Sequence, residues 1–126
     1  MPAQITHQIF ADELLRRSLG KEESSTLNRY YPLLTLAAQG PDIFYHNQRT
    51  KPSGFSFGRL IHTNGFGLLI AAMLKYAIRK NAGLYSDLAV FILGFTSHAF
   101  LDRKTHPYII YFSGWVEPGK AETESF

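Results

Sequence analysis

Hydrophobic residues recur with a helical period along most of the chain, and no stretch shows the strict alternation of a strand. Thr6 is a suitable N-cap for the first helix, and Gly20 suits the position just beyond its end. Pro32 and Gly40 bracket a second helix in a similar way. The pattern predicts helices over residues 7–19, 33–39, 55–80 and 84–105. The fold is therefore expected to be all-α.

The two longer predicted helices carry a few polar residues on their apolar sides. His62 shares an apolar stripe with Phe66, and His98 shares one with Asp102. Pro107 disfavours helical geometry at the residue before it, so the last helix is expected to end near residue 105. A polar site between packed helices is the arrangement that this pattern predicts.

Length and composition fit one compact helical domain. With 126 residues, of which 45% are hydrophobic, the chain is long enough to bury a core. We expect this domain to occupy residues 1–112, with residues 113–126 as a flexible tail or the start of a truncated region.

Charge and targeting signals narrow the function only slightly. The formal net charge of +3 is compatible with phosphate-bearing ligands but too small to indicate nucleic acid. The absence of cysteine excludes thiol nucleophiles and cysteine zinc sites. No signal peptide is recognisable, and the apolar run over residues 66–78 is interrupted by Lys75 and short for a membrane span. A cytoplasmic protein is expected.

Three residues with metal-binding side chains, His98, Asp102 and His106, follow one another at intervals of four. Positions four apart lie on one helix face, so His98 and Asp102 are expected to point at the same spot. A nitrogen ligand and an oxygen ligand on one face suit a divalent metal such as zinc. His106 lies at or beyond the expected helix end, so its direction is less defined.

Further candidate ligands come from other segments. His7 and His62 fall on the apolar stripes of two other helices, and Asp42 stands in an aromatic segment. Burying a carboxylate is costly unless a partner compensates, and one cation would serve several of these groups at once. The ordinary alternatives are core histidines, a turn or cap role for Asp42, a helix-ending turn at His106 and an exposed loop at His46.

Four segments of the chain together carry a resemblance to a known family. They are Thr6-His7, Gly40-Pro41-Asp42, Gly58-Arg59-Leu60-Ile61-His62 and Gly94-x-x-Ser97-His98-Ala99-x-x-Asp102-x-x-Thr105-His106-Pro107. They resemble the zinc-dependent phospholipase C family, which shares an all-helical fold and a clustered zinc site with the S1/P1-type nucleases.

The resemblance implies a site of one to three zinc ions. Asp42, His62, His98 and Asp102 would hold the first ion, His7 a second with Asp102 bridging, and His106 a third. The implied activity is phosphodiester hydrolysis by metal-activated water that attacks phosphorus, with Asp42 as both ligand and general base. The implied substrate is a small-molecule or lipid phosphodiester, with transient contact to a membrane surface.

Two other functions stay open at this point. No histidine follows His106, whereas the third zinc of the family needs a later histidine. A non-catalytic helical metal-binding or interaction module is therefore one alternative, and an S1/P1-like nuclease is the other.

Overall fold

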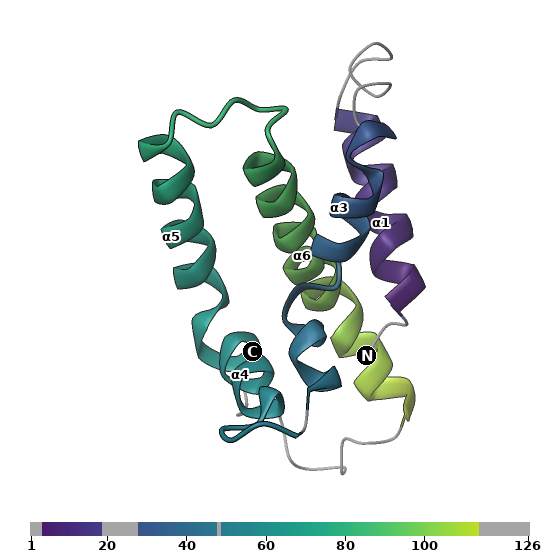
Figure 1. The fold of residues 1–126 in the computed structure, drawn as a ribbon. Helices are drawn as coiled ribbons and strands as arrows, with labels where there is room; N and C mark the ends of the chain where they lie inside the picture. The colour runs from purple at the N-terminus through teal and green to yellow at the C-terminus, as the bar shows by residue number, and fades with distance from the viewer. Residues whose placement is uncertain (1–3, 19–27, 48, 114–126) are drawn as a thin grey trace.

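The computed structural model describes residues 4–18, 28–47 and 49–113, and all regular elements in these ranges are helices. Figure 1 shows them as a bundle. The elements are α1 (Gln4–Ser18), α3 (Tyr31–Ala37), the 3₁₀-helix η1 (Gly40–His46), α4 (Gly54–Leu60), the π-helix η2 (Ile61–Gly65), α5 (Phe66–Arg79) and α6 (Asp87–Ser113). The predicted all-α class is confirmed.

The core lies where α1, α3 and α6 pack together. Its buried members are Ala11, Leu15, Leu34, Ala38 and Val90. Gly94 lets α6 approach α3 closely, because a Cβ at this position would lie 2.8 Å from the Ala37 Cβ. This close packing holds α6 against the segment that carries Asp42.

The long helix α6 differs from its prediction at both ends. It begins at Asp87 rather than at residue 84, and the Ser86 hydroxyl accepts a hydrogen bond from the Ala89 N–H as a cap. It also continues through Pro107 to Ser113, so the expected end near residue 105 is wrong. Proline removes one backbone hydrogen bond, but Arg103 and Pro107 are exposed, so water can satisfy the carbonyl of residue 103. His106 therefore lies inside the helix.

The remaining helix boundaries lie closer to those predicted from the sequence. Helix α1 begins at Gln4, so Thr6 lies in its first turn rather than at its cap. Gly40 follows α3 with a φ of +54°, the left-handed conformation expected beyond a helix end. Gly20 and residues 114–126 of the predicted tail (113–126) lie outside the described residues, while Ser113 is the last residue of α6.

The predicted helix over residues 55–80 is one helical run that contains a change of pitch. Helices α4 and α5 are joined by the π-helical turn η2, and π turns frequently occur at functional sites. This run, Gly54–Arg79, has 26 residues and is long and apolar enough to cross a membrane. Only 6% of its most apolar 18-residue window is buried within the protein. The short apolar run expected from sequence is therefore part of a longer helix. Length and composition alone decide nothing about a membrane span, so the cytoplasmic location stays a prediction.

Candidate metal centre

His98 is the fixed centre of the site. It lies on α6, its side chain is fully buried, and its Nδ1–H donates a hydrogen bond of 3.1 Å to the Ala38 carbonyl. This bond leaves the Nε2 lone pair free to bind a cation. Gly40 lies directly against the ring, since a Cβ there would be 2.5 Å from the His98 Cγ. The turn after α3 therefore fixes both the tautomer and the position of His98.

His62 reaches the same point from the π turn η2. Its Nδ1–H donates to the Gly58 carbonyl at 2.7 Å, and the Tyr45 hydroxyl lies 3.2 Å from the same nitrogen. The Tyr45 ring stacks on the imidazole with 11° between the planes. A Cβ at Gly58 would lie 2.5 Å from Tyr45 Cε1, so this glycine makes room for the tyrosine. The His62 Nε2 atom is thereby turned toward the centre.

Asp42 and Asp102 supply the oxygen ligands. Asp42 comes from η1 and Asp102 from α6, one turn after His98, and both are buried. Asp42 Oδ1 lies 3.2 Å from His62 Nε2 and 3.9 Å from His98 Nε2. Asp102 Oδ2 lies 3.1 Å from His98 Nε2 and 3.6 Å from His62 Nε2. The two histidine Nε2 atoms are 3.3 Å apart.

These five spacings match the edges of a tetrahedron around zinc. With zinc–ligand bonds of about 2.0–2.2 Å, neighbouring ligand atoms lie about 3.3–3.6 Å apart. The observed spacings of 3.1–3.9 Å cluster around that range. The four residues that the resemblance assigned to the first ion therefore lie close enough together to share one ion.

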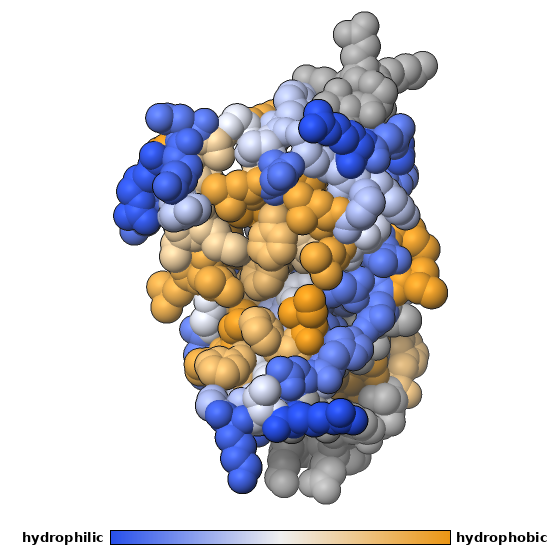
Figure 2. All heavy atoms as spheres, in the orientation of Figure 1, coloured by the Kyte–Doolittle hydropathy of each residue, from blue (hydrophilic) through white to orange (hydrophobic). Residues whose placement is uncertain are grey.

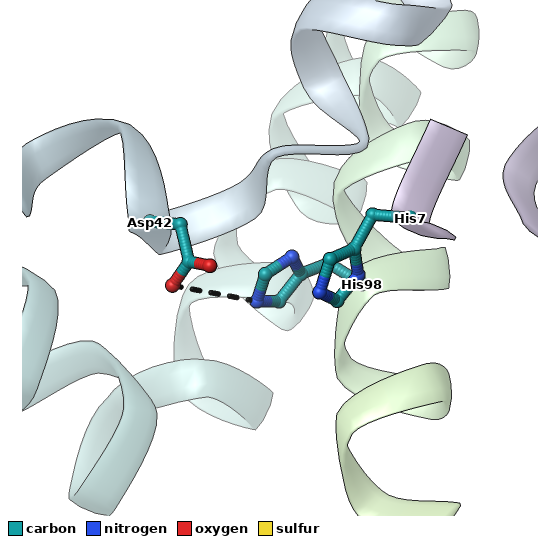
Figure 3. A group of neighbouring side chains, drawn as sticks. All are labelled: His7, Asp42 and His98. Atoms are coloured by element: carbon teal, nitrogen blue, oxygen red, sulfur yellow. Dashed lines mark ion pairs between the residues drawn. The ribbon is translucent and has the colours of Figure 1, made fainter. Parts of the chain in front are cut away.

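The other carboxylate oxygen of Asp102 faces two more histidines. Its Oδ1 atom lies 3.4 Å from His7 Nε2 and 3.3 Å from His106 Nε2. The buried His7 ring, from α1, stacks on His98 at 4.0 Å, as Figure 3 shows together with Asp42. His7 and His106 therefore both face the same oxygen of Asp102, and the third ion implied for His106 stays a prediction.

Several buried polar atoms here lack a hydrogen-bond partner among the described residues. They include both ring nitrogens of His7, Oδ1 of Asp42 and Oδ1 of Asp102. The two carboxylate oxygens lie within ion-pair distance of histidine nitrogens, but these contacts lack hydrogen-bond geometry. Buried polar atoms without partners are rare and costly. A cation bound among these side chains would supply the missing partner.

The electrostatics of the cluster also favour a cation. Burial would raise the pKa of Asp102, but the neighbouring His106, His62 and His98 lower it well below its ordinary value. Burial would lower the pKa of His62, but the neighbouring carboxylates of Asp102 and Asp42 raise it to about 10. Without a metal, a proton on His62 thus sits between the carboxylates.

His7 and Tyr45 respond mainly to burial. Burial, with the nearby His98, lowers the pKa of His7 to about 4, so the ring is neutral and able to bind a cation at neutral pH. Burial and the charges of Asp42 and Asp102 raise the pKa of Tyr45, so its hydroxyl stays protonated.

A cavity of about 670 Å³ opens beside the centre, between η2, α5 and α6. Its walls include three candidate ligands, His62, Asp102 and His106. The other lining residues are polar (Thr63, Asn64, Arg103) and apolar (Phe66, Ile70, Phe100, Pro107), among others. A ligand in this cavity would therefore reach the centre from one side.

All six residues predicted as ligands converge: His7, Asp42, His62, His98, Asp102 and His106. Two three-residue groups among them, which share His98, each have ligand atoms within 4.8 Å of one another. His46 does not join them; it is exposed and contacts the Gln4 side chain at 2.7 Å. Asp42 is not among the residues that line the cavity, so its role as general base stays a prediction, whereas its position fits a ligand.

Sequence reasoning missed the groups that orient the histidines. Neither Tyr45 nor the carbonyls of Ala38 and Gly58 were identified as orienting groups. The one available signal was the spacing of four between Gly58 and His62, which places the glycine carbonyl within reach of the imidazole on a helix.

Replacing Tyr45 by phenylalanine is expected to weaken zinc binding by about 10-fold while leaving the fold intact. The ring stack on His62 remains, but one of the two oxygens beside Nδ1 is lost, and such outer partners contribute 10- to 100-fold. Titration of metal-free protein with zinc measures the effect. Tyr108→Phe, at an exposed position of α6, is the matched control. Equal affinity of Tyr45→Phe and the control would show that the hydroxyl does not orient His62.

No family model, curated protein or solved structure matches this chain. The motif resemblance is thus neither supported nor contradicted by these comparisons, and the geometry of the centre is the firmer basis for a function. That geometry is a buried cluster of histidine and aspartate side chains that could hold a metal ion.

Proposed function

We propose that the protein is a zinc-dependent phosphodiester hydrolase similar to phospholipase C. The observation that carries the proposal is the cluster of six histidine and aspartate donors beside an open cavity. A structural zinc site is filled by four protein ligands, whereas a catalytic zinc keeps three and leaves one position for water or substrate. An ion held by His7, His106 and Asp102 would have three protein ligands, and His106 and Asp102 line the cavity.

Each part of the centre has a distinct task in this proposal. Asp42, His62, His98 and Asp102 hold one ion, and His7 and His106 hold a second through the other oxygen of Asp102. Bound there, zinc supplies a Lewis acid for the phosphoryl oxygens and activates water near neutral pH. The carbonyls of Ala38 and Gly58 keep the Nε2 atoms of His98 and His62 directed at the metal.

The cavity walls suit a phosphodiester with an apolar portion. Arg103 and Asn64 offer donors for phosphoryl oxygens near the centre, and Phe66, Ile70 and Phe100 form an apolar wall. A small-molecule or lipid phosphodiester would place its phosphorus at the ligands and its remaining part along that wall.

Hydrolysis of bis(p-nitrophenyl) phosphate by zinc-loaded protein tests the proposal. We expect turnover that chelator abolishes and zinc restores, and that Asp102→Asn eliminates. Asp87→Asn, an exposed aspartate on the same helix, is the matched control and should keep full activity. Turnover that survives chelator would contradict the proposal. Bound zinc without turnover of this substrate or of a phosphorylcholine ester would instead favour the metal-binding module.

A further inference from the structure

The helical run Gly54–Arg79 carries large apolar side chains that the described parts of the chain leave about half or more exposed. Phe57 is 47% exposed, Leu68 77% and Ile78 74%. The other large exposed apolar residues of the run are Phe55, Leu60, Leu74 and Tyr76. We name these seven residues the α4–α5 surface. Soluble proteins rarely leave so much apolar area open without a partner for it.

Basic residues surround this surface, and acidic residues are absent from it. Between residues 43 and 86 the sequence contains no aspartate or glutamate, although the whole chain has ten. The same stretch has six basic residues, all exposed: Arg49, Lys51, Arg59, Lys75, Arg79 and Lys80. Figure 2 shows apolar side chains gathered across the middle of the molecule. Strongly hydrophilic groups lie at the C-terminal end of α5 and below α4 in this view.

We propose that the α4–α5 surface docks on a lipid surface that carries negative charge. Exposed apolar side chains can enter the boundary between headgroups and acyl chains, while lysine and arginine at the ends of the helix contact the headgroup phosphates. An apolar helix with basic ends and no acidic residues is typical of a segment that binds an anionic lipid surface. This inference is independent of the hydrolase activity proposed above.

The same charge pattern argues against a second copy as the occupant. In a symmetric dimer the same patch of both subunits is opposed, so Lys75, Arg79 and Lys80 would face a patch with no acidic residue to pair with. Like charges that oppose each other at an interface are costly. An anionic lipid surface supplies the missing negative charge.

Docking in this way would also bring the cavity close to the lipid. Phe66, Gly67 and Ile70 belong to α5 and line the cavity beside the metal centre. A cavity whose wall is part of the docked helix lies next to the membrane surface.

Flotation of the full chain with vesicles tests the proposal at neutral pH. One set of vesicles is phosphatidylcholine alone, and the other is an equal mixture with phosphatidylglycerol. We expect binding to the mixed vesicles only, and release in about 1 M salt, where charges are screened beyond about 3 Å. Lys75→Gln with Arg79→Gln should weaken binding about 25-fold, because each basic residue near the surface contributes about fivefold. Leu68→Ser should weaken binding as well.

Matched controls lie on α1, whose main packing partners are α3 and α6. Arg16→Gln with Arg17→Gln changes the net charge equally. Ile9→Ser removes an apolar side chain that is 64% exposed, compared with 77% for Leu68. Both should bind as the unchanged protein does. Failure to float with mixed vesicles, or equal losses in the controls, would overturn the proposal. So would a dimer in solution that Leu68→Ser dissociates, or protein that stays with the vesicles after an alkaline wash.

Discussion

Replacing Asp102 by asparagine is expected to abolish zinc binding at both positions of the centre. The Asp102 carboxylate directs one oxygen at His62 and His98 and the other at His7 and His106. Asparagine keeps the size but removes the charge and one of the two acceptor oxygens. Because loss of an outer partner alone costs 10- to 100-fold, loss of the shared ligand should cost more than about 100-fold in affinity.

Thermal unfolding with and without chelator makes this loss visible. At an ion concentration about 1,000 times the dissociation constant, a metal that binds only the folded chain stabilises it by about 4 kcal/mol. For a domain of this size, chelator should then lower the Tm of the original protein by about 10 °C or more. Chelator should leave the Tm of Asp102→Asn unchanged, and Asp87→Asn should respond as the original does. A chelator-sensitive Asp102→Asn would show that Asp102 is not the shared ligand.

Gly40→Ala is expected to be the most damaging small substitution near the centre. The added Cβ would lie 2.5 Å from His98 Cγ and 2.8 Å from His98 Cβ, and the backbone φ of +54° is unfavourable for alanine. The left-handed conformation alone costs about 1–2 kcal/mol, and overpacking of a buried ring typically adds about 1–3 kcal/mol. Relief of the clash would move His98 away from the other ligands, so zinc affinity should fall together with stability.

Gly83→Ala is the matched control for this substitution. Gly83 has no positive φ, and a Cβ there would meet nothing within 4 Å. Urea unfolding of metal-free protein, combined with zinc titration, should show the losses in Gly40→Ala alone. If Gly40→Ala bound zinc as tightly as Gly83→Ala, the role of this turn in positioning His98 would be wrong.

The spacing of His98 and Asp102 shows what sequence can predict. Residues four apart on a helix share a face whatever the tertiary structure, so their joint direction followed from periodicity alone. The apolar stripes that hold His7 and His62 predicted burial in the same way. If the apolar sides of these helices pack together, their polar side chains meet in one place, where a single compensating partner can serve all of them.

Other features depend on contacts between segments and could not be derived from the chain. Pro107 predicted a helix end, but hydration on the exposed side of α6 lets the helix continue, which places His106 one turn after Asp102. The direction of His62 depends on the π turn and on Tyr45, 17 residues away. The Ala38 carbonyl that orients His98 is 60 residues distant in sequence.

The central claim is that one metal ion lies among Asp42, His62, His98 and Asp102. Elemental analysis of protein purified without chelator, beside a His98→Ala variant, tests it most directly. We expect at least one zinc or similar ion per chain in the original protein and little or none in His98→Ala. A chain that folds with these helices yet contains no stoichiometric metal, even after incubation with zinc, would contradict it.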